Sequence, residues 1–191
     1  MTVLSNRALI EAMDAGRLRI DPRPAPTPEV RGSPFGSCSV DLHLGRTIFI
    51  PRRGLQVTLD IRGALTPTLD ALYERREIAD EGWVLEPGRF LLGRTIEVVD
   101  LPLSGNGLAA RIEGRSSFAR AGLLVHFTAP TIHAGFTGSI ALEIINLGEF
   151  ALVLRPGSAI CQLIVETVEG EPIRSDSQFQ HQSAPTGAAA P

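Results

Sequence analysis

The chain has 191 residues, of which 43% are hydrophobic and 20% are charged, and its formal net charge is −3. This composition fits one compact domain and excludes disorder throughout, and the lack of a basic run argues against general binding to nucleic acid. All 18 basic residues are arginine, which excludes a Schiff-base lysine and the lysine of a phosphate-binding loop.

The first quarter of the chain predicts a short helix, a proline-rich connector and a strand. Ser5 can cap the helix and Gly16 can end it. Residues 21–36 contain prolines at positions 22, 24, 26, 28 and 34, which predict an extended connector. Polar and apolar residues alternate over 39–44, so we expect a half-buried strand there.

The remainder predicts one more short helix and then many short strands. Thr66-Pro67 opens the helix, and Pro87-Gly88 and Pro156-Gly157 are turn signals between apolar runs. We expect strands over residues 95–99, 108–112, 123–128, 140–145, 151–154 and 160–167. Short strands at such regular spacing favour a mainly β barrel or jelly roll. We expect one domain over residues 1–182 and a flexible tail over 183–191.

Location can also be predicted from the sequence. No apolar run is long enough to span a bilayer, and the N-terminus lacks the apolar core of a signal peptide. Two cysteines in a chain of this size need no disulfide framework. We therefore expect a cytoplasmic protein that has no membrane partner.

Segment 114–123 is the first of four stretches that hold more polar residues than a barrel core requires. Arg115 and Arg120 flank Ser116 and Ser117. If one of the serines capped a short helix, hydroxyls, backbone N–H groups and arginine forks would face an anion. An ordinary helix cap with surface arginines explains the same residues equally well.

Glu143 is the second candidate. Ile140, Leu142 and Ile144 occupy one face of its predicted strand, so Glu143 lies on the other face with Ala141. A partly desolvated carboxylate between apolar neighbours is a candidate general base. A strand glutamate that faces solvent or pairs with arginine is the more common arrangement.

The last two stretches carry less specific signals. His126 and His133 lie in a predicted strand and turn with no acidic partner at metal-ligand spacing, so we interpret them as structural. The amides and one aromatic ring of residues 177–182 could cover a nucleotide or form a polar tail. The zinc-deaminase signature is absent.

Taken in this order, these stretches resemble the dCTP deaminase family of the dUTPase-like superfamily. The resemblance covers residues 4–186. The most specific part is the string Gly-Arg-Ser-Ser-x-Ala-Arg-x-Gly-Leu with a downstream Leu-Glu. The motifs that carry the resemblance lie at residues 39–45, 114–123, 125–129, 135–138, 142–143, 155–157 and 178–182.

The resemblance implies a β-barrel homotrimer whose active sites lie between subunits and deaminate dCTP to dUTP. Glu143 would be the general base for a water that the Ala129 carbonyl also holds. From a neighbouring subunit, Ser116 and Arg120 would organise the base and water, and Arg115 and Ser117 would bind phosphates. Mg²⁺ would be bound through the triphosphate with no direct protein ligand, and zinc would not be needed.

Further nucleotide contacts are implied at Thr128, His133, Phe136, Gln178, Phe179 and Gln182. His133 stands where dUTPases have an aspartate that orients the hydrolytic water, so we expect no dUTP pyrophosphatase activity. Gln178 replaces a phosphate-binding lysine of the family. Two alternatives stay open: deamination of a modified or less phosphorylated cytosine nucleotide, and a non-catalytic or dUTPase-like nucleotide-binding trimer.

Overall fold

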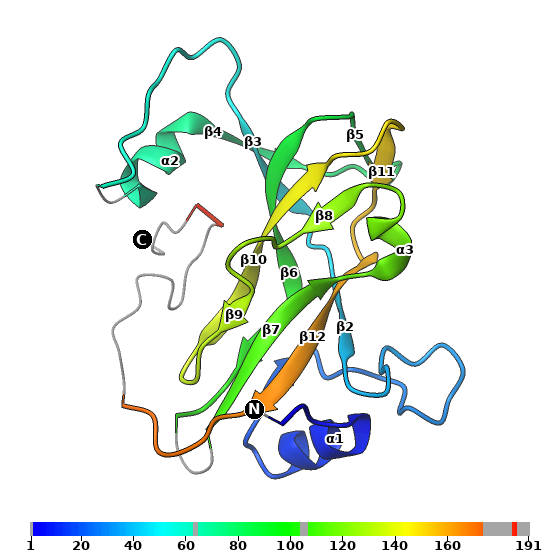
Figure 1. The fold of residues 1–191 in the computed structure, drawn as a ribbon. Coiled ribbons are helices and arrows are strands. Elements are labelled where there is room, and N and C mark those ends of the chain that lie inside the picture. The colour runs from blue at the N-terminus through cyan, green and yellow to red at the C-terminus, as the bar shows by residue number, and fades with distance from the viewer. Residues whose placement is uncertain (1, 63–64, 104–106, 174–184, 187–191) are drawn as a thin grey trace.

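The computed structural model describes residues 2–62, 65–103, 107–173 and 185–186. Its helices are α1 (Asn6–Asp14), α2 (Thr66–Leu72) and α3 (Ser116–Ala119). Its strands are β1 (Arg19–Asp21), β2 (Val40–His43), β3 (Thr47–Pro51), β4 (Tyr73–Glu77), β5 (Trp83–Leu85), β6 (Phe90–Asp100), β7 (Leu108–Gly114), β8 (Leu123–Val125), β9 (Thr131–Ile132), β10 (Thr137–Asn146), β11 (Leu152–Leu154) and β12 (Ala159–Thr167). The predicted mainly β fold with a few short helices is confirmed (Figure 1).

The strands form three antiparallel sheets. The largest has the order β4-β3-β6-β10-β8, with β1 also paired to β6. The second has the order β2-β12-β7-β9, and β5 pairs with β11. Apolar residues of both larger sheets, such as Leu142 and Leu163, belong to one buried cluster. The architecture is a jelly roll, since no strand pairing among the described residues closes a barrel.

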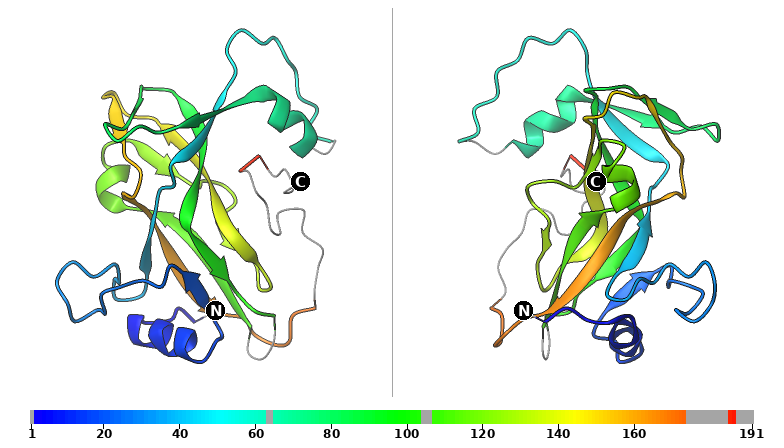
Figure 2. Two further views of the ribbon diagram at one scale, coloured as in Figure 1. Left: turned by 180° about the vertical axis from the view of Figure 1, so that it is seen from behind. Right: turned by 45° about the vertical axis from the view of Figure 1, so that its right-hand side comes forward.

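The three helices lie outside the sheets. The Ser5 hydroxyl accepts a hydrogen bond from the Ala8 backbone N–H at 3.3 Å, which confirms the predicted cap of α1. Leu9 and Ala12 are buried on the face of α1 that packs against the core. Figures 1 and 2 show α1 and α2 at opposite ends of the molecule. None of the described helices is both long and apolar enough to cross a membrane.

One strand is shorter than the sequence predicts. We expected a strand over 123–128, but β8 ends at Val125. The backbone of His126 has φ +55° and that of Thr128 has φ +75°, which are left-handed conformations that cannot continue a strand. The chain therefore turns sharply after Val125, and this turn shapes the surroundings of Glu143.

Asn146 holds the loop that follows β10. Its side chain is fully buried, and its Nδ2 donates to the carbonyls of Leu85 at 2.9 Å and Phe150 at 2.8 Å. Its Oδ1 accepts from the Gly148 backbone N–H at 3.0 Å. One amide thus ties the 147–150 loop to β5.

We predict that Asn146→Ala lowers the free energy of unfolding by about 3 kcal/mol, because buried backbone partners lose their hydrogen bonds. Urea denaturation followed by circular dichroism measures this change. Asn6→Ala is the control, since within the described residues the side-chain Oδ1 of Asn6 accepts only from the adjacent backbone N–H of Arg7, and we expect a change within about 0.5 kcal/mol. A loss below about 1 kcal/mol for Asn146→Ala would show that other contacts hold the loop.

Candidate active site

Glu143 lies near the middle of β10. Ile140, Leu142 and Ile144 are buried, and Glu143 is on the opposite face, as the alternation predicts. Its side chain is 33% exposed. The register places Glu143 beside Leu92 of β6, with an apolar residue next to the carboxylate. The carboxylate is therefore partly desolvated yet reachable.

His126 faces this carboxylate. Its Nδ1 lies 3.1 Å from Oε2 of Glu143, and its backbone N–H donates to the Glu143 carbonyl at 2.7 Å. The imidazole is buried, and within the described residues neither ring nitrogen nor Oε2 of Glu143 makes a well-aligned hydrogen bond. Buried polar atoms nearly always have partners in native proteins. The arrangement thus leaves hydrogen-bonding capacity for a ligand at Glu143.

Aromatic residues lie on the segments that adjoin Glu143 and His126. Tyr73, at the start of β4, is half-buried, and burial together with the charge of Glu143 raises the pKa of its phenol. The rings of Phe90 and Phe127 meet edge to face with centroids 6.3 Å apart. Phe90 lies across from Ile145 in the register of β10 with β6, and Phe127 follows His126 directly in the chain, so both rings come from segments that adjoin Glu143.

The turn between β8 and β10 carries further predicted residues. Thr128 and Ala129 are exposed after His126, and His133 is exposed beyond β9. Phe136 is 9% exposed and belongs to the buried core cluster. Contacts of these residues with a nucleotide stay predictions.

The α3 segment presents a second group of polar side chains. The N-cap of α3 is Arg115, with no side-chain capping bond, so the idea that Ser116 or Ser117 caps the helix is wrong. Both serines follow the cap and are exposed. Their hydroxyls are therefore not engaged in capping.

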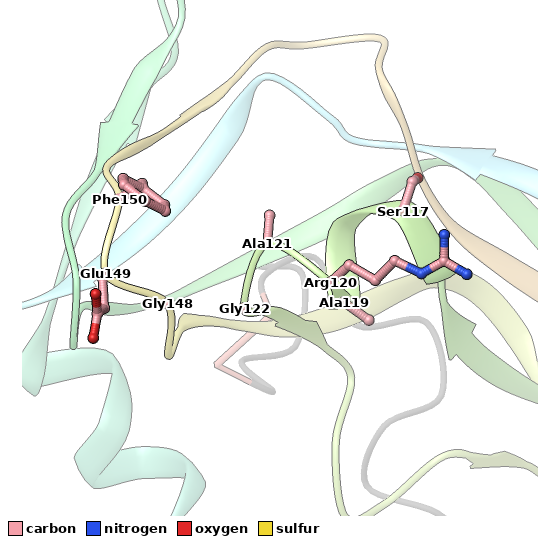
Figure 3. A pocket seen from close by; sticks show the side chains of 8 residues that line it. All are labelled: Ser117, Ala119, Arg120, Ala121, Gly122, Gly148, Glu149 and Phe150. Carbon is pink, nitrogen blue, oxygen red and sulfur yellow. The ribbon is translucent and has the colours of Figure 1, made fainter.

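Arg120 and Ser117 line an open pocket of about 600 Å³ together with Ala119, Ala121, Gly122, Gly148, Glu149 and Phe150. Figure 3 shows Arg120 and Ser117 on one side of the pocket and Glu149 and Phe150 on the other. The guanidinium of Arg120 forms no hydrogen bond or ion pair with any residue that the structure describes. The guanidinium can therefore bind an anionic group such as a carboxylate or a phosphate.

A single chain does not bring these two groups together. Glu143 does not line the Arg120 pocket. Over the described ranges, no hydrogen bond or ion pair joins Glu143 to Ser116, Ser117 or Arg120. Arg115 instead forms an ion pair with Asp41.

Residues 185 and 186, near the end of the chain, lie against α2. The predicted residues Gln178, Phe179 and Gln182 lie outside the described residues. Thr186 is described, and its hydroxyl donates to a carboxylate oxygen of Asp70 in α2 at 3.2 Å. Figure 1 shows residues 185 and 186 in red close to α2.

Comparisons with known proteins identify a family that the chain resembles. A family model described as dCTP deaminase-like matches residues 3–168. A Rhodospirillum rubrum protein named dCTP deaminase is 39% identical over 169 residues, which are 86% of this chain and 82% of that protein. A Dictyoglomus thermophilum protein named dCTP deaminase, dUMP-forming, is 34% identical over 195 residues, covering 97% of this chain and 93% of that one.

A solved structure supports the fold. The crystal structure of 2′-deoxycytidine 5′-triphosphate deaminase from Agrobacterium tumefaciens aligns with a TM-score of 0.62 at 22% identity. The alignment covers 85% of this chain and 47% of that chain, so this chain spans about half the length of that protein.

Proposed function

Because the chain belongs to the dCTP deaminase-like family, we propose that it catalyses the hydrolytic deamination of dCTP to dUTP and ammonia. The observation that carries this proposal is the partly exposed carboxylate of Glu143, which faces the buried imidazole of His126. A carboxylate in such a setting can take a proton from water without a metal.

In the proposed reaction Glu143 is the general base. It accepts a proton from a water that the Ala129 carbonyl also orients, and the resulting hydroxide adds to C4 of the cytosine ring. Glu143 then returns the proton to the amino nitrogen of the tetrahedral adduct, the C4–N bond breaks and ammonia leaves, and the C4 hydroxyl becomes the carbonyl as its proton passes to N3. Nδ1 of His126 lies beside this carboxylate, 3.1 Å from Oε2.

We propose that the remaining catalytic groups come from a neighbouring subunit of a homotrimer. Ser116 and Arg120 are exposed, and neither contacts Glu143 within one chain. Placed at a partner's Glu143, the Arg120 guanidinium would favour the charged form of the base. In such an assembly, each active site would combine Glu143 of one subunit with Ser116 and Arg120 of its neighbour.

Arg115 and Ser117 are proposed to bind the triphosphate. Guanidinium and hydroxyl groups match phosphate oxygens, and Mg²⁺ prefers phosphate oxygens and water to a cationic guanidinium. Mg²⁺ would therefore be held by the phosphates and water, where it neutralises charge. The nucleotide contacts proposed to complete the site come from Thr128, His133, Phe136, Gln178, Phe179 and Gln182. We propose that the reaction takes place in the cytoplasm.

A nucleotide panel tests the function. The purified protein is incubated with dCTP, dCMP, 5-methyl-dCTP and dUTP, and ammonia, pyrophosphate and the nucleotide product are measured. We expect ammonia and dUTP from dCTP, and no pyrophosphate from dUTP. Ammonia together with dUMP and pyrophosphate would overturn the expectation drawn from His133, and binding without ammonia would overturn the deaminase proposal.

A further inference from the structure

We propose that Asp41 is a positioning residue that holds Arg115 in the orientation needed to bind phosphate. The inference rests on the proposed function, because that function assigns the triphosphate to Arg115. Asp41 belongs to the first strand that the alternating sequence pattern predicts, and no step of the proposed reaction uses it.

The contacts around Asp41 form a short chain. Nη1 of Arg115 donates to Oδ2 of Asp41 at 2.8 Å. The other carboxylate oxygen, Oδ1, accepts from Nε2 of Gln162 at 3.0 Å, and the same Nε2 lies 3.3 Å from the Ser39 hydroxyl. Both oxygens of Asp41 are thus bound, so the carboxylate has a fixed orientation.

The four-stranded sheet builds this arrangement. Asp41 of β2 lies directly across from Gln162 of β12, and Gln162 lies across from Glu113 of β7. Arg115 follows β7 immediately. The carboxylate and its amide partner therefore stand on paired strands, which are more rigid supports than loops.

Burial distinguishes this ion pair from the surface pairs of the molecule. The side chain of Asp41 is 14% exposed and that of Arg115 is 32% exposed. The Arg115 guanidinium carbon also lies 5.9 Å from the centre of the Phe118 ring, which adds a second contact. In contrast, both side chains of the Arg46–Asp80 pair, at 54% and 89%, are mostly exposed.

The geometry leaves Arg115 able to bind an anion. A guanidinium has five N–H groups, and Asp41 takes a hydrogen bond from Nη1 alone. The carboxylate weakens the attraction of Arg115 for phosphate, but it also fixes the fork before the nucleotide arrives. Preorganisation of this kind lowers the entropy lost on binding. We infer that fixing the orientation of Arg115 favours phosphate binding more than the nearby charge of Asp41 weakens it.

Steady-state kinetics of Asp41→Asn test the proposal. Asparagine keeps the size of the side chain and an oxygen acceptor but removes the charge that holds Arg115. We expect KM for dCTP to rise about tenfold with kcat within about twofold. Asp41→Glu keeps the charge and is expected to recover part of the loss. Asp80→Asn is the matched control, since it removes an exposed partner of Arg46, and its KM is expected to stay unchanged.

A double-mutant cycle tests whether Asp41 affects KM through Arg115. Arg115→Ala is expected to raise KM, and adding Asp41→Asn to that variant is expected to raise it no further. Additive effects would overturn the proposal, because Asp41 would then act without Arg115. An unchanged or lower KM in Asp41→Asn would also overturn it, whatever happens to the melting temperature. Failure of the wild-type chain to release ammonia from dCTP would instead refute the proposed function, and this inference with it.

Discussion

Glu143→Gln is expected to lower kcat for dCTP deamination about a thousandfold while the Kd for dCTP stays within about threefold. Glutamine has nearly the same shape as glutamate but cannot accept the proton of the attacking water. The rest of the site is unchanged, because the register of β10 with β6 depends on the backbone. This variant should therefore bind dCTP almost as the wild type does but deaminate it far more slowly.

Ammonia release measures the chemistry, and calorimetric titration with dCTP measures the binding. Glu11→Gln is the control, since Glu11 is exposed on α1, at the opposite end of the molecule from α2. The kcat of this control variant should match that of the wild type. Near-normal turnover by Glu143→Gln would refute the role of general base. Loss of dCTP binding with a normal melting temperature would instead assign Glu143 to recognition of the substrate.

Glu143 illustrates what sequence alone could predict. The alternation of residues 140–145 placed the carboxylate on the face opposite the core, and the structure confirms that face. Period-two patterns report side-chain direction reliably because strand geometry is local. The same reasoning predicted the alternating burial of β2 and the Ser5 cap of α1, both of which are confirmed.

Contacts between distant segments could not be predicted in this way. His126 was interpreted as structural, and its position against Glu143 depends on the pairing of β8 with β10 and on a left-handed backbone at His126. The ion pair of Asp41 with Arg115 likewise requires β2, β12 and β7 to lie side by side. Neither spacing nor composition encodes such a register, because it is decided by packing of the whole sheet.

The α3 segment shows a different limit. The sequence suggested a helix there only on the condition that Ser116 or Ser117 capped it, whereas the helix that forms has Arg115 at its N-cap. The serine hydroxyls are thereby left exposed, together with Arg120. Arg115 follows the last residue of β7 and has an extended backbone, so the helix begins one residue after the strand with no side-chain cap. Neither hydroxyl is used to cap the helix.

If the sites are shared between subunits, two inactive variants should restore activity to each other. We predict that Glu143→Gln and Arg120→Ala are each inactive alone and regain activity when unfolded, mixed equally and refolded together. A site works when one subunit supplies an intact Glu143 and its neighbour supplies an intact Arg120. Each condition holds for half of the chains, so random assembly restores about one quarter of the wild-type rate.

The control mixture combines Glu143→Gln with Glu143→Ala, in which no subunit has the base, and it should stay inactive. Native mass spectrometry confirms that mixed oligomers have formed before ammonia release is measured. Mixed oligomers without recovered activity would show that Glu143 and Arg120 act within one chain, against the separation seen here. Recovery near one quarter would show that the active site forms only when subunits assemble. It would also explain why Glu143 does not line the Arg120 pocket within one chain, since each residue would contribute to a site shared with a neighbouring subunit.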